Sequence, residues 1–367
     1  MSNARVIDCD VHPMIRDRGE PLEQYLPAPM RRRLAGRTTA LVEPLPASRF
    51  AHPGGHVLRP DARPPSGGPP GSDPEYVKED LLDRFEVSAA VLLPLQGAAT
   101  SAWTNPQEAA ALASAFNDYF IEHWLPVDRR FNLAITVAPQ DPHTAAEEVR
   151  RVGATDGVVS VWVPFLDILI GQRHYHPIFD AAHELGLPIT LHGCGTEGMY
   201  QGLPSFASGT PTTYAERYVD FFQFGIGHLA SIVFEGVLDR FPGLRFGFTE
   251  MGWSWLPSTL ARLDQAWQAS RVEIPWVTRR PSEYVRDCVR FTSQPIEEPE
   301  GKGDYVAHMS RLADAEHTLM FSSDYPHWDN DQYTRAIRKL PEDMRDAVSF
   351  ENAMELYRPR VAEGVTA

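Results

Sequence analysis

Short runs of consecutive hydrophobic residues recur along the chain and predict eight β-strands. The runs are rich in Val and Ile, and they lack the strict alternation of a strand that has one face in water. Unbroken runs of this kind are typical of parallel strands that are buried on both faces. The predicted strands are Arg5–Asp10, Ala89–Pro94, Phe131–Val137, Gly157–Val163, Leu187–His192, Leu244–Glu250, Cys288–Thr292 and Thr318–Asp324.

Segments with hydrophobic residues at helical spacing lie between these runs, and a glycine closes one of them at Gly186. Strand and helix therefore alternate, which indicates an α/β fold: a distorted (β/α)8 TIM barrel formed by residues 1–367 as one domain. An open, doubly wound sheet is the alternative. The predicted helices are Asn105–Trp124, Asp141–Val152, His176–Leu185, Gln223–Phe241 and Trp255–Ser270.

Residues 36–76 interrupt this alternation. Pro and Gly are dense there, above all in Pro64–Gly71, so we predict a loop insertion after the first strand, with neither strand nor helix. Loops that follow barrel strands lie over the C-terminal end of the barrel, where active sites are built. The insertion is therefore either a cover for a substrate or a mobile surface loop. The short polar tail after Tyr357 is predicted to fray.

Composition and charge narrow the class of protein. Hydrophobic residues make up 43% of the chain, which suffices for a large core. The formal net charge of -15 disfavours a nucleic acid partner, because phosphate contacts need clustered Lys and Arg. No signal peptide pattern begins the chain and no hydrophobic run is long enough to span a membrane. We therefore expect a cytoplasmic protein that binds no membrane.

Polar residues follow four of the predicted strands, at the end where a barrel builds its active site. Asp10 and His12 end the first strand, and their alternate spacing lets both side chains face the barrel axis. His192 ends the fifth strand and Asp324 the eighth. Two imidazoles and two carboxylates suit Zn, Mn or Fe. We therefore predict a divalent metal that is held by Asp10, His12, His192 and Asp324.

Four more polar residues are candidates for the same site. Glu250 ends the sixth strand, where burial would suit it to general acid or base catalysis or to metal binding. His228 lies on a predicted helix and is either a structural residue or a further ligand or catalytic group. His327 and Asp329 follow Asp324, and either could orient the ligands.

Several segments together resemble the amidohydrolase-related branch of the metal-dependent amidohydrolase superfamily. This branch includes aminocarboxymuconate-semialdehyde decarboxylase and the aromatic-acid decarboxylases. The resemblance covers nearly the whole chain except the insertion at 36–76. The matching segments are Val6–His12, Pro177–His192, Gly236–Leu244, Thr249–Pro257 and Phe321–His327.

The resemblance implies a distorted barrel with a divalent metal, and it assigns ligand positions to His12, His192 and Asp324. Asp10 stands where many members have the first His of a His-x-His pair. Glu250 stands where many decarboxylases of the branch have His, which is a departure from the simple decarboxylase pattern. The resemblance further implies a homo-oligomer such as a dimer, or a hetero-oligomer with a paralogue.

Three functions follow from the resemblance and the predicted metal site. The first is a metal-dependent hydrolase or decarboxylase that acts on a small carboxylated or cyclic molecule, with Asp324 or Glu250 moving the proton. The second is an O2-activating dinuclear Fe or Mn oxygenase, because members that resemble this chain at Asp324–Asp329 look like such enzymes. Glu250, His228 or His327 would then help to hold the second metal. The third is a non-catalytic subunit of a heteromeric enzyme.

Overall fold

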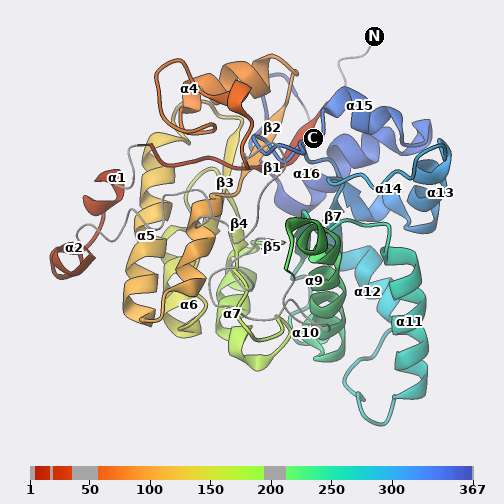
Figure 1. The fold of residues 1–367 in the computed structure, drawn as a ribbon. Coiled ribbons are helices and arrows are strands. Elements are labelled where there is room, and N and C mark those ends of the chain that lie inside the picture. The colour runs from red at the N-terminus through yellow and green to blue at the C-terminus, as the bar shows by residue number, and fades with distance from the viewer. Residues whose placement is uncertain (1–4, 17–19, 35–56, 194–211, 366–367) are drawn as a thin grey trace.

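The computed structural model of the chain describes residues 5–16, 20–34, 57–193 and 212–365. Eight parallel strands form one sheet, in which each strand pairs with its neighbour in sequence (Figure 1). The predicted barrel and its eight strands are confirmed. The strands are β1 (Ile7–Val11), β2 (Ala89–Leu92), β3 (Phe131–Thr136), β4 (Val158–Trp162), β5 (Ile189–His192), β6 (Phe246–Thr249), β7 (Val289–Thr292) and β8 (Leu319–Met320).

Backbone hydrogen bonds between the first strand and the last segment close the sheet into a barrel. The Cys9 amide donates to the Phe321 carbonyl at 3.0 Å, and the His12 amide donates to the Tyr325 carbonyl at 2.7 Å. The regular part of β8 is shorter than predicted, because Thr318 ends a helix and the Phe321 amide donates to Val348 at 2.8 Å.

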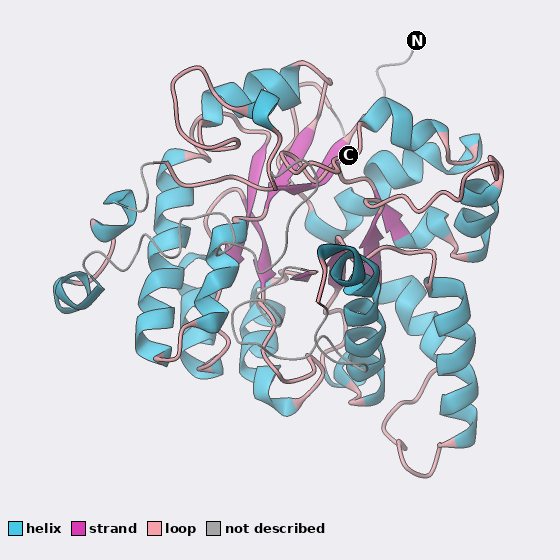
Figure 2. Ribbon diagram, viewed as in Figure 1, coloured by secondary structure: helices cyan, strands magenta, loops and turns pink. Residues whose placement is uncertain are grey.

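Helices surround the strands, as Figure 2 shows in cyan and magenta. Asn105 and Asp141 start two of them, since each side chain accepts from backbone amides of the first turn. The helices are α1 (Glu20–Glu23), α2 (Ala28–Leu34), α4 (Pro74–Val77), α5 (Pro106–His123), α6 (Pro142–Val152), α7 (His176–Leu185), α9 (Tyr214–Phe234), α10 (Val237–Arg240), α11 (Leu256–Ala269), α12 (Pro281–Cys288), α13 (Tyr305–Leu312), α14 (Ala315–Thr318), α15 (Tyr333–Arg338) and α16 (Asn352–Tyr357).

One predicted helix, Gln223–Phe241, has the wrong bounds. The observed α9 begins earlier, at Tyr214, because Thr213 and Glu216 form a capping box: the Glu216 amide donates to Thr213 Oγ1 at 3.2 Å and the Thr213 amide donates back to Glu216 Oε2 at 2.7 Å. It also ends earlier, because Gly236 adopts a left-handed backbone with φ +71° and starts the separate helix α10.

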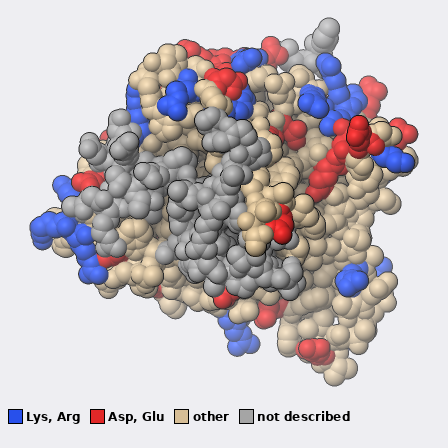
Figure 3. Space-filling view, viewed as in Figure 1, with Lys and Arg blue, Asp and Glu red and all other residues tan. Residues whose placement is uncertain are grey.

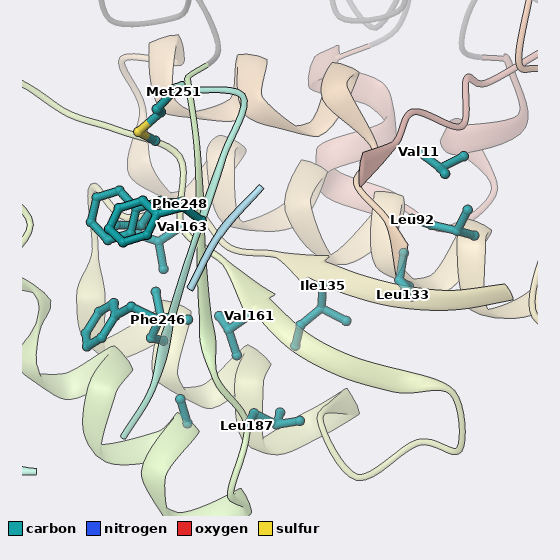
Figure 4. Packing of buried hydrophobic residues seen from close by; sticks show 14 of the residues in the cluster. Val11, Leu92, Leu133, Ile135, Val161, Val163, Leu187, Phe246, Phe248 and Met251 are labelled. Atoms are coloured by element: carbon teal, nitrogen blue, oxygen red, sulfur yellow. The ribbon is translucent and has the colours of Figure 1, made fainter. Parts of the chain in front are cut away.

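Hydrophobic side chains on the outside of the strands pack against the helices. Figure 4 shows Ile135, Val161, Phe246 and neighbouring residues in this layer. The Phe246 ring lies edge-on to Phe179 of α7, with 5.6 Å between the ring centroids. Burial of this layer holds the helices to the barrel.

The C-terminal segment covers the N-terminal end of the barrel. The Tyr357 hydroxyl of α16 lies 3.2 Å from Thr190 Oγ1 of β5. Beyond α16, the Arg360 amide donates to Asn132 Oδ1 at 2.7 Å, and the Ala362 amide donates to Ser88 O at 2.8 Å. The expectation of a frayed tail is therefore wrong for residues 358–365, because the strand ends offer these partners.

The predicted insertion falls partly outside the described residues, which resume at residue 57. Residues 57–76 contain a 3₁₀-helix at Pro60–Ala62 and the start of α4, so the prediction of no helix is wrong there. Asp73 explains the start of α4, because its side chain accepts from the Glu75 and Tyr76 amides. This part of the insertion lies at the C-terminal end of the barrel: the Trp328 amide donates to Val57 O at 3.0 Å.

On the face seen in Figure 3, Lys and Arg side chains lie in several separate groups, and one of them lies at the left edge, where Figure 1 shows α2 with its consecutive residues Arg31, Arg32 and Arg33. No helix within the described part of the chain is both long enough and apolar enough to cross a membrane.

Candidate metal centre

The C-terminal ends of β1, β5, β6 and β8 bring five of the predicted site residues together. Asp10 lies in β1, whose pairing register with β2 shifts between Asp8 and Val11, and His12 follows β1 directly. His192 ends β5, and Glu250 follows β6 directly. Asp324 follows the extended segment after β8. The strand-end rule therefore locates these groups correctly, although their role as ligands stays a prediction.

Two of the carboxylate residues stand at sharp backbone turns. Glu250 has φ +55° and Asp324 has φ +61°, which are unusual values for residues other than glycine. Hydrogen bonds hold both turns: the Glu250 amide donates to Thr292 Oγ1 at 3.0 Å, and the Asp324 amide donates to Asp10 O at 3.1 Å. A left-handed backbone costs about 1 to 3 kcal/mol, so the surrounding structure fixes these carboxylates in place.

The donor atoms of the first group of candidate ligands lie close together. His12 Nε2 lies 3.2 Å from Asp10 Oδ1 and 2.9 Å from Asp324 Oδ1. His192 Nε2 lies 3.1 Å from Glu250 Oε2 and 3.6 Å from Asp10 Oδ2. Asp10, His12, His192 and Glu250 each offer a donor atom, and these atoms lie within 4.8 Å of one another.

A second group overlaps the first. His12, Glu250, Asp324 and His327 also offer donor atoms within 4.8 Å of one another. His327 Nδ1 lies 2.6 Å from Asp324 Oδ1, and its ring centroid lies 4.7 Å from that of His12. His327 thus belongs to the cluster itself, and His12 and Glu250 are shared by both groups.

Neighbouring residues orient these side chains. His12 Nδ1 donates to the Leu93 carbonyl at 2.9 Å, so its Nε2 carries the lone pair and faces the carboxylates. Gln294 Nε2 donates to Asp324 Oδ2 at 3.3 Å. Asp8 Oδ1 accepts from the Asp10 amide at 3.3 Å and from the Ser323 amide at 2.9 Å, which ties the two ligand-bearing segments together.

The donor atoms fit a bound cation. Among the residues that the structure describes, buried atoms of this cluster make no hydrogen bond: both carboxylate oxygens of Asp10, Nε2 of His12, both ring nitrogens of His192 and Nε2 of His327. A buried polar atom without a partner costs about 1 to 3 kcal/mol, so several at one point indicate a ligand that satisfies them together. Imidazole and carboxylate donors suit Zn, Mn or Fe.

The pKa shifts of the clustered side chains are consistent with a bound cation. Burial raises the pKa of Glu250 well above its ordinary value, and the charge of Asp324 adds to the rise. Burial likewise raises the pKa of Asp324, with Asp329 as the next cause. Burial lowers the pKa of His12 to about 3, which keeps its imidazole neutral and able to bind a metal. A divalent cation would favour the ionised carboxylates and release their protons.

His228, the remaining predicted catalytic residue, is not in either donor group. Its ring is buried in α9 and stacks on Phe165, with 4.0 Å between the ring centroids. Its Nδ1 accepts from the Ile170 amide at 3.1 Å. These contacts fit the structural alternative for His228, because the ring packs and bonds to a loop of the fold.

The sequence indicated Asp329 as a residue near the ligands, but it did not indicate Gln294. The Asp329 carbonyl accepts from Gln294 Nε2 at 3.4 Å, and the Asp329 charge acts on Asp324. Gln294 was missed as a site residue because β7 ends in Thr292 without a charged or imidazole group. Its position just beyond the C-terminal end of a barrel strand is the signal that could have found it.

Comparison with known proteins agrees with this geometry. A family model described as amidohydrolase matches residues 7–358. The gamma-resorcylate decarboxylase of Rhodococcus jostii (strain RHA1) is 26% identical over 220 residues, which are 55% of this chain. The chain spans 63% of the length of that relative.

Two solved structures of similar fold are decarboxylases. The 5-carboxyvanillate decarboxylase from Sphingomonas paucimobilis shares 21% identity and a TM-score of 0.68, covering 97% of this chain and 99% of that one. The 5-carboxyvanillate decarboxylase from Novosphingobium aromaticivorans, complexed with manganese and a nitrobenzoic acid, shares 18% identity and a TM-score of 0.66, covering 97% of each chain. At these identities the likeness establishes the fold.

Proposed function

The chain belongs to the amidohydrolase family, and from this premise we propose that it is a metal-dependent enzyme that decarboxylates a small carboxylated ring or hydrolyses a small cyclic molecule. The observation that carries the proposal is the set of buried donor atoms of Asp10, His12 and His192 at the C-terminal end of the barrel. Decarboxylation is the favoured reaction, because relatives of similar sequence or fold are named decarboxylases of aromatic acids.

Asp10, His12, His192 and Asp324 would hold the cation. A divalent cation supplies positive charge that draws a substrate carboxylate or carbonyl and stabilises the negative charge that develops there. Manganese is bound in a 5-carboxyvanillate decarboxylase of similar fold, and Zn or Fe suits the same donors.

We propose that Glu250 moves the proton that decarboxylation requires. The bond between the ring carbon and the carboxyl carbon breaks, CO2 leaves, and the ring carbon keeps the electron pair and takes up a proton. The Glu250 side chain is 11% exposed, whereas that of Asp324 is fully buried. Burial raises the pKa of both carboxyls, so either can carry a proton, but Glu250 is the one that a substrate can reach.

One observation favours the oxygenase as a second candidate. The second donor group adds Asp324 and His327 to Glu250, and a carboxylate with two oxygens can bridge two cations, whereas His12 has one free lone pair and can bind only one of them. An O2-activating dinuclear Fe or Mn oxygenase needs such a pair. The comparisons give this candidate no support, because the relatives are named decarboxylases.

Elemental analysis of protein purified without added metal, beside Asp324→Ala, tests the proposal. Glu298→Gln is the matched control, because Glu298 pairs with Lys339 at 2.8 Å and is not in either donor group. The same samples are then offered 2,6-dihydroxybenzoate and 5-carboxyvanillate with and without O2, and CO2 release is followed.

The outcomes separate the candidates. About one equivalent of Mn or Zn, lost in Asp324→Ala and kept in Glu298→Gln, with CO2 release that is independent of O2, supports the decarboxylase. About two equivalents of Fe or Mn and a need for O2 and reductant support the oxygenase. Metal without turnover of either acid, with or without O2, favours the non-catalytic subunit. Absence of metal from the unmutated protein contradicts the central proposal.

We also propose that residues 1–367 act as one domain in the cytoplasm, and that the chain forms a homodimer or pairs with a paralogue. The resemblance supports an oligomer. Light scattering coupled to gel filtration measures the mass directly, and a monomer of 41.1 kDa would contradict the oligomer.

A further inference from the structure

A cavity of about 270 Å³ lies between α9, the segment after β6 and the segment after β7. It is named here the side cavity, and no residue of either donor group lines it. Its walls are mainly apolar. Val219 of α9 (green in Figure 1) is exposed, so the cavity opens to solvent there. The lining residues are Tyr218, Val219, Phe222, Met251, Gly252, Pro295, Ile296 and Glu297.

Glu297 is the residue of this lining that can carry a charge at neutral pH. Ser254 Oγ donates to its Oε2, and its Oε1 faces Gly252. A Cβ atom on Gly252 would lie 2.7 Å from this Oε1, and Gly252 has φ +63°, so glycine is what lets the carboxyl group approach. The backbone is thus shaped to hold a carboxyl group in an apolar wall.

The Glu297 carboxyl group has no cationic partner among the residues that the structure describes. The described lining residues include no Lys, Arg or His, and Lys339 pairs with the neighbouring Glu298 at 2.8 Å. Burial raises the pKa of Glu297, because an unpaired charge is costly in an apolar environment. A cation bound beside this carboxyl group would favour its ionised form.

Two more carboxylates stand behind the walls of the side cavity. The Tyr218 side chain is hydrogen-bonded to Asp329, and the Ile296 amide donates to Asp331 Oδ2 at 3.3 Å. Burial raises the pKa of Tyr218, and the negative charge of Asp329 adds to the rise. The side cavity therefore combines apolar walls with a negative electrostatic potential.

The size and the walls of the side cavity limit its occupant. An engineered cavity of roughly 150 Å³ holds benzene, and pockets for drug-sized ligands begin at about 300 Å³. A volume of about 270 Å³ therefore suits one ring with a short substituent. Met251 and Ile296 offer apolar contacts, and the aromatic rings of Tyr218 and Phe222 are of the kind that attracts organic cations.

We propose that the side cavity binds a small organic ammonium ion, whose apolar body fills the cavity and whose N–H groups donate to Glu297. The proposal goes beyond the reaction at the metal centre and does not depend on it, because no donor residue lines the cavity. An anion would meet like charge there, and a neutral ring would leave the carboxylate unpaired. The ligand class is therefore a primary amine on a ring or on a short branched alkyl group.

Isothermal titration calorimetry on manganese-loaded protein tests this, because manganese occupies the carboxylates of the metal centre. The probes are benzylamine, which is protonated at neutral pH, and benzyl alcohol, which has nearly the same shape and no charge. We expect benzylamine to bind about tenfold more tightly. In Glu297→Gln this preference should shrink to about twofold or less, since the amide carries no charge.

Matched variants complete the design. Glu298→Gln removes the same charge one residue away, from a side chain that does not line the cavity, and should keep the preference. Val219→Lys puts a positive charge at the exposed rim and should weaken benzylamine about threefold without affecting benzyl alcohol, whereas Val219→Gln should change neither. Thermal unfolding and manganese content of every variant are measured first, and the titrations are repeated on metal-free protein.

Equal binding of the two probes to the unmutated protein overturns the proposal, and so does an unchanged preference in Glu297→Gln or an equal loss in Glu298→Gln. A preference that is seen only in metal-free protein also overturns it, because the ammonium ion then binds at the metal centre. If Glu297→Gln does not fold, the rim variants decide: the same benzylamine affinity in Val219→Lys and Val219→Gln contradicts the proposal.

Discussion

At the scale of single residues, Glu250 shows whether the proposed proton carrier also binds the cation, because its carboxylate belongs to both donor groups, as the imidazole of His12 does. Its Oε2 lies 3.1 Å from His192 Nε2, and its backbone turn is held by Thr292. A neutral amide keeps the shape of this side chain but removes the charge that a divalent cation needs.

Glu250→Gln is therefore expected to weaken manganese binding by about 100-fold. Competition with a chelator of known affinity measures the change. Glu298→Gln serves as the control and should bind manganese as the unmutated protein does. An equal affinity in both variants would show that Glu250 does not contact the cation.

His228 differs from Glu250, because its contacts are those of a residue that stabilises the fold and it belongs to neither donor group. Burial lowers its pKa to about 3 from an ordinary 6.5. The buried imidazole contributes its full stability to the fold above pH 6.5, where it is neutral in both the folded and the unfolded chain. This contribution is lost as the pH falls from 6.5 towards 3, because the unfolded chain takes up a proton that the folded chain resists.

His228→Asn is expected to keep the metal content and to cost about 2 kcal/mol of unfolding free energy near neutral pH. Because Asn does not titrate, that cost should shrink by about 1 kcal/mol for each pH unit below the ordinary histidine pKa. Urea unfolding in the presence of a chelator, at several pH values, measures it. A cost that is independent of pH, or a loss of metal in the variant, would refute the structural role.

At the scale of elements, the strands and the five strand-end residues could be predicted from the sequence, since hydrophobic runs and barrel geometry are local and general signals. Other features depend on contacts between distant segments. The left-handed turns at Glu250 and Asp324 leave no glycine signal, because tertiary hydrogen bonds impose them.

The insertion contacts the metal centre as an element, because it hydrogen-bonds to the segment that follows His12 and to the segment that follows Asp324. The Met14 amide donates to Gly71 O at 2.8 Å, and the Arg59 amide donates to Pro326 O at 2.9 Å. Gly71 has φ +76°, and a Cβ atom there would lie 2.8 Å from the His12 carbonyl oxygen. The insertion therefore packs directly on the backbone that carries His12.

Gly71→Ala is expected to displace the His12 segment and to weaken manganese binding by at least about tenfold. Gly67→Ala is the matched control: Gly67 has φ +89°, and its nearest atom would be Arg16 Nη2 at 3.9 Å. Both variants should lose about 1 kcal/mol from the backbone strain alone. Chelator competition and thermal unfolding on both variants separate the two effects. The same metal affinity in both would show that the contact with His12 is unimportant.

At the scale of the whole molecule, the two ends of the barrel have different tasks. The C-terminal end gathers the candidate ligands, whereas α16 and the tail cover the N-terminal end through Tyr357, Arg360 and Ala362. The two ends of a barrel of this kind are separated by the length of its strands, so stability and metal binding should respond to different changes.

Removal of the chain after Arg358 tests this separation. The truncation deletes two hydrogen bonds between Arg360 and Asn132, the Arg360 bond to Phe131 O at 2.6 Å and the Ala362 bond to Ser88 O. At about 1 kcal/mol for each bond, the loss is about 4 kcal/mol, which lowers Tm by roughly 5 °C in a chain of this size. Asp156→Asn removes only an exposed ion pair with Arg360 and should change Tm by less than about 1 °C. Manganese affinity should be unchanged in both proteins, whereas a parallel loss of metal in the truncated chain would mean that the two ends are linked.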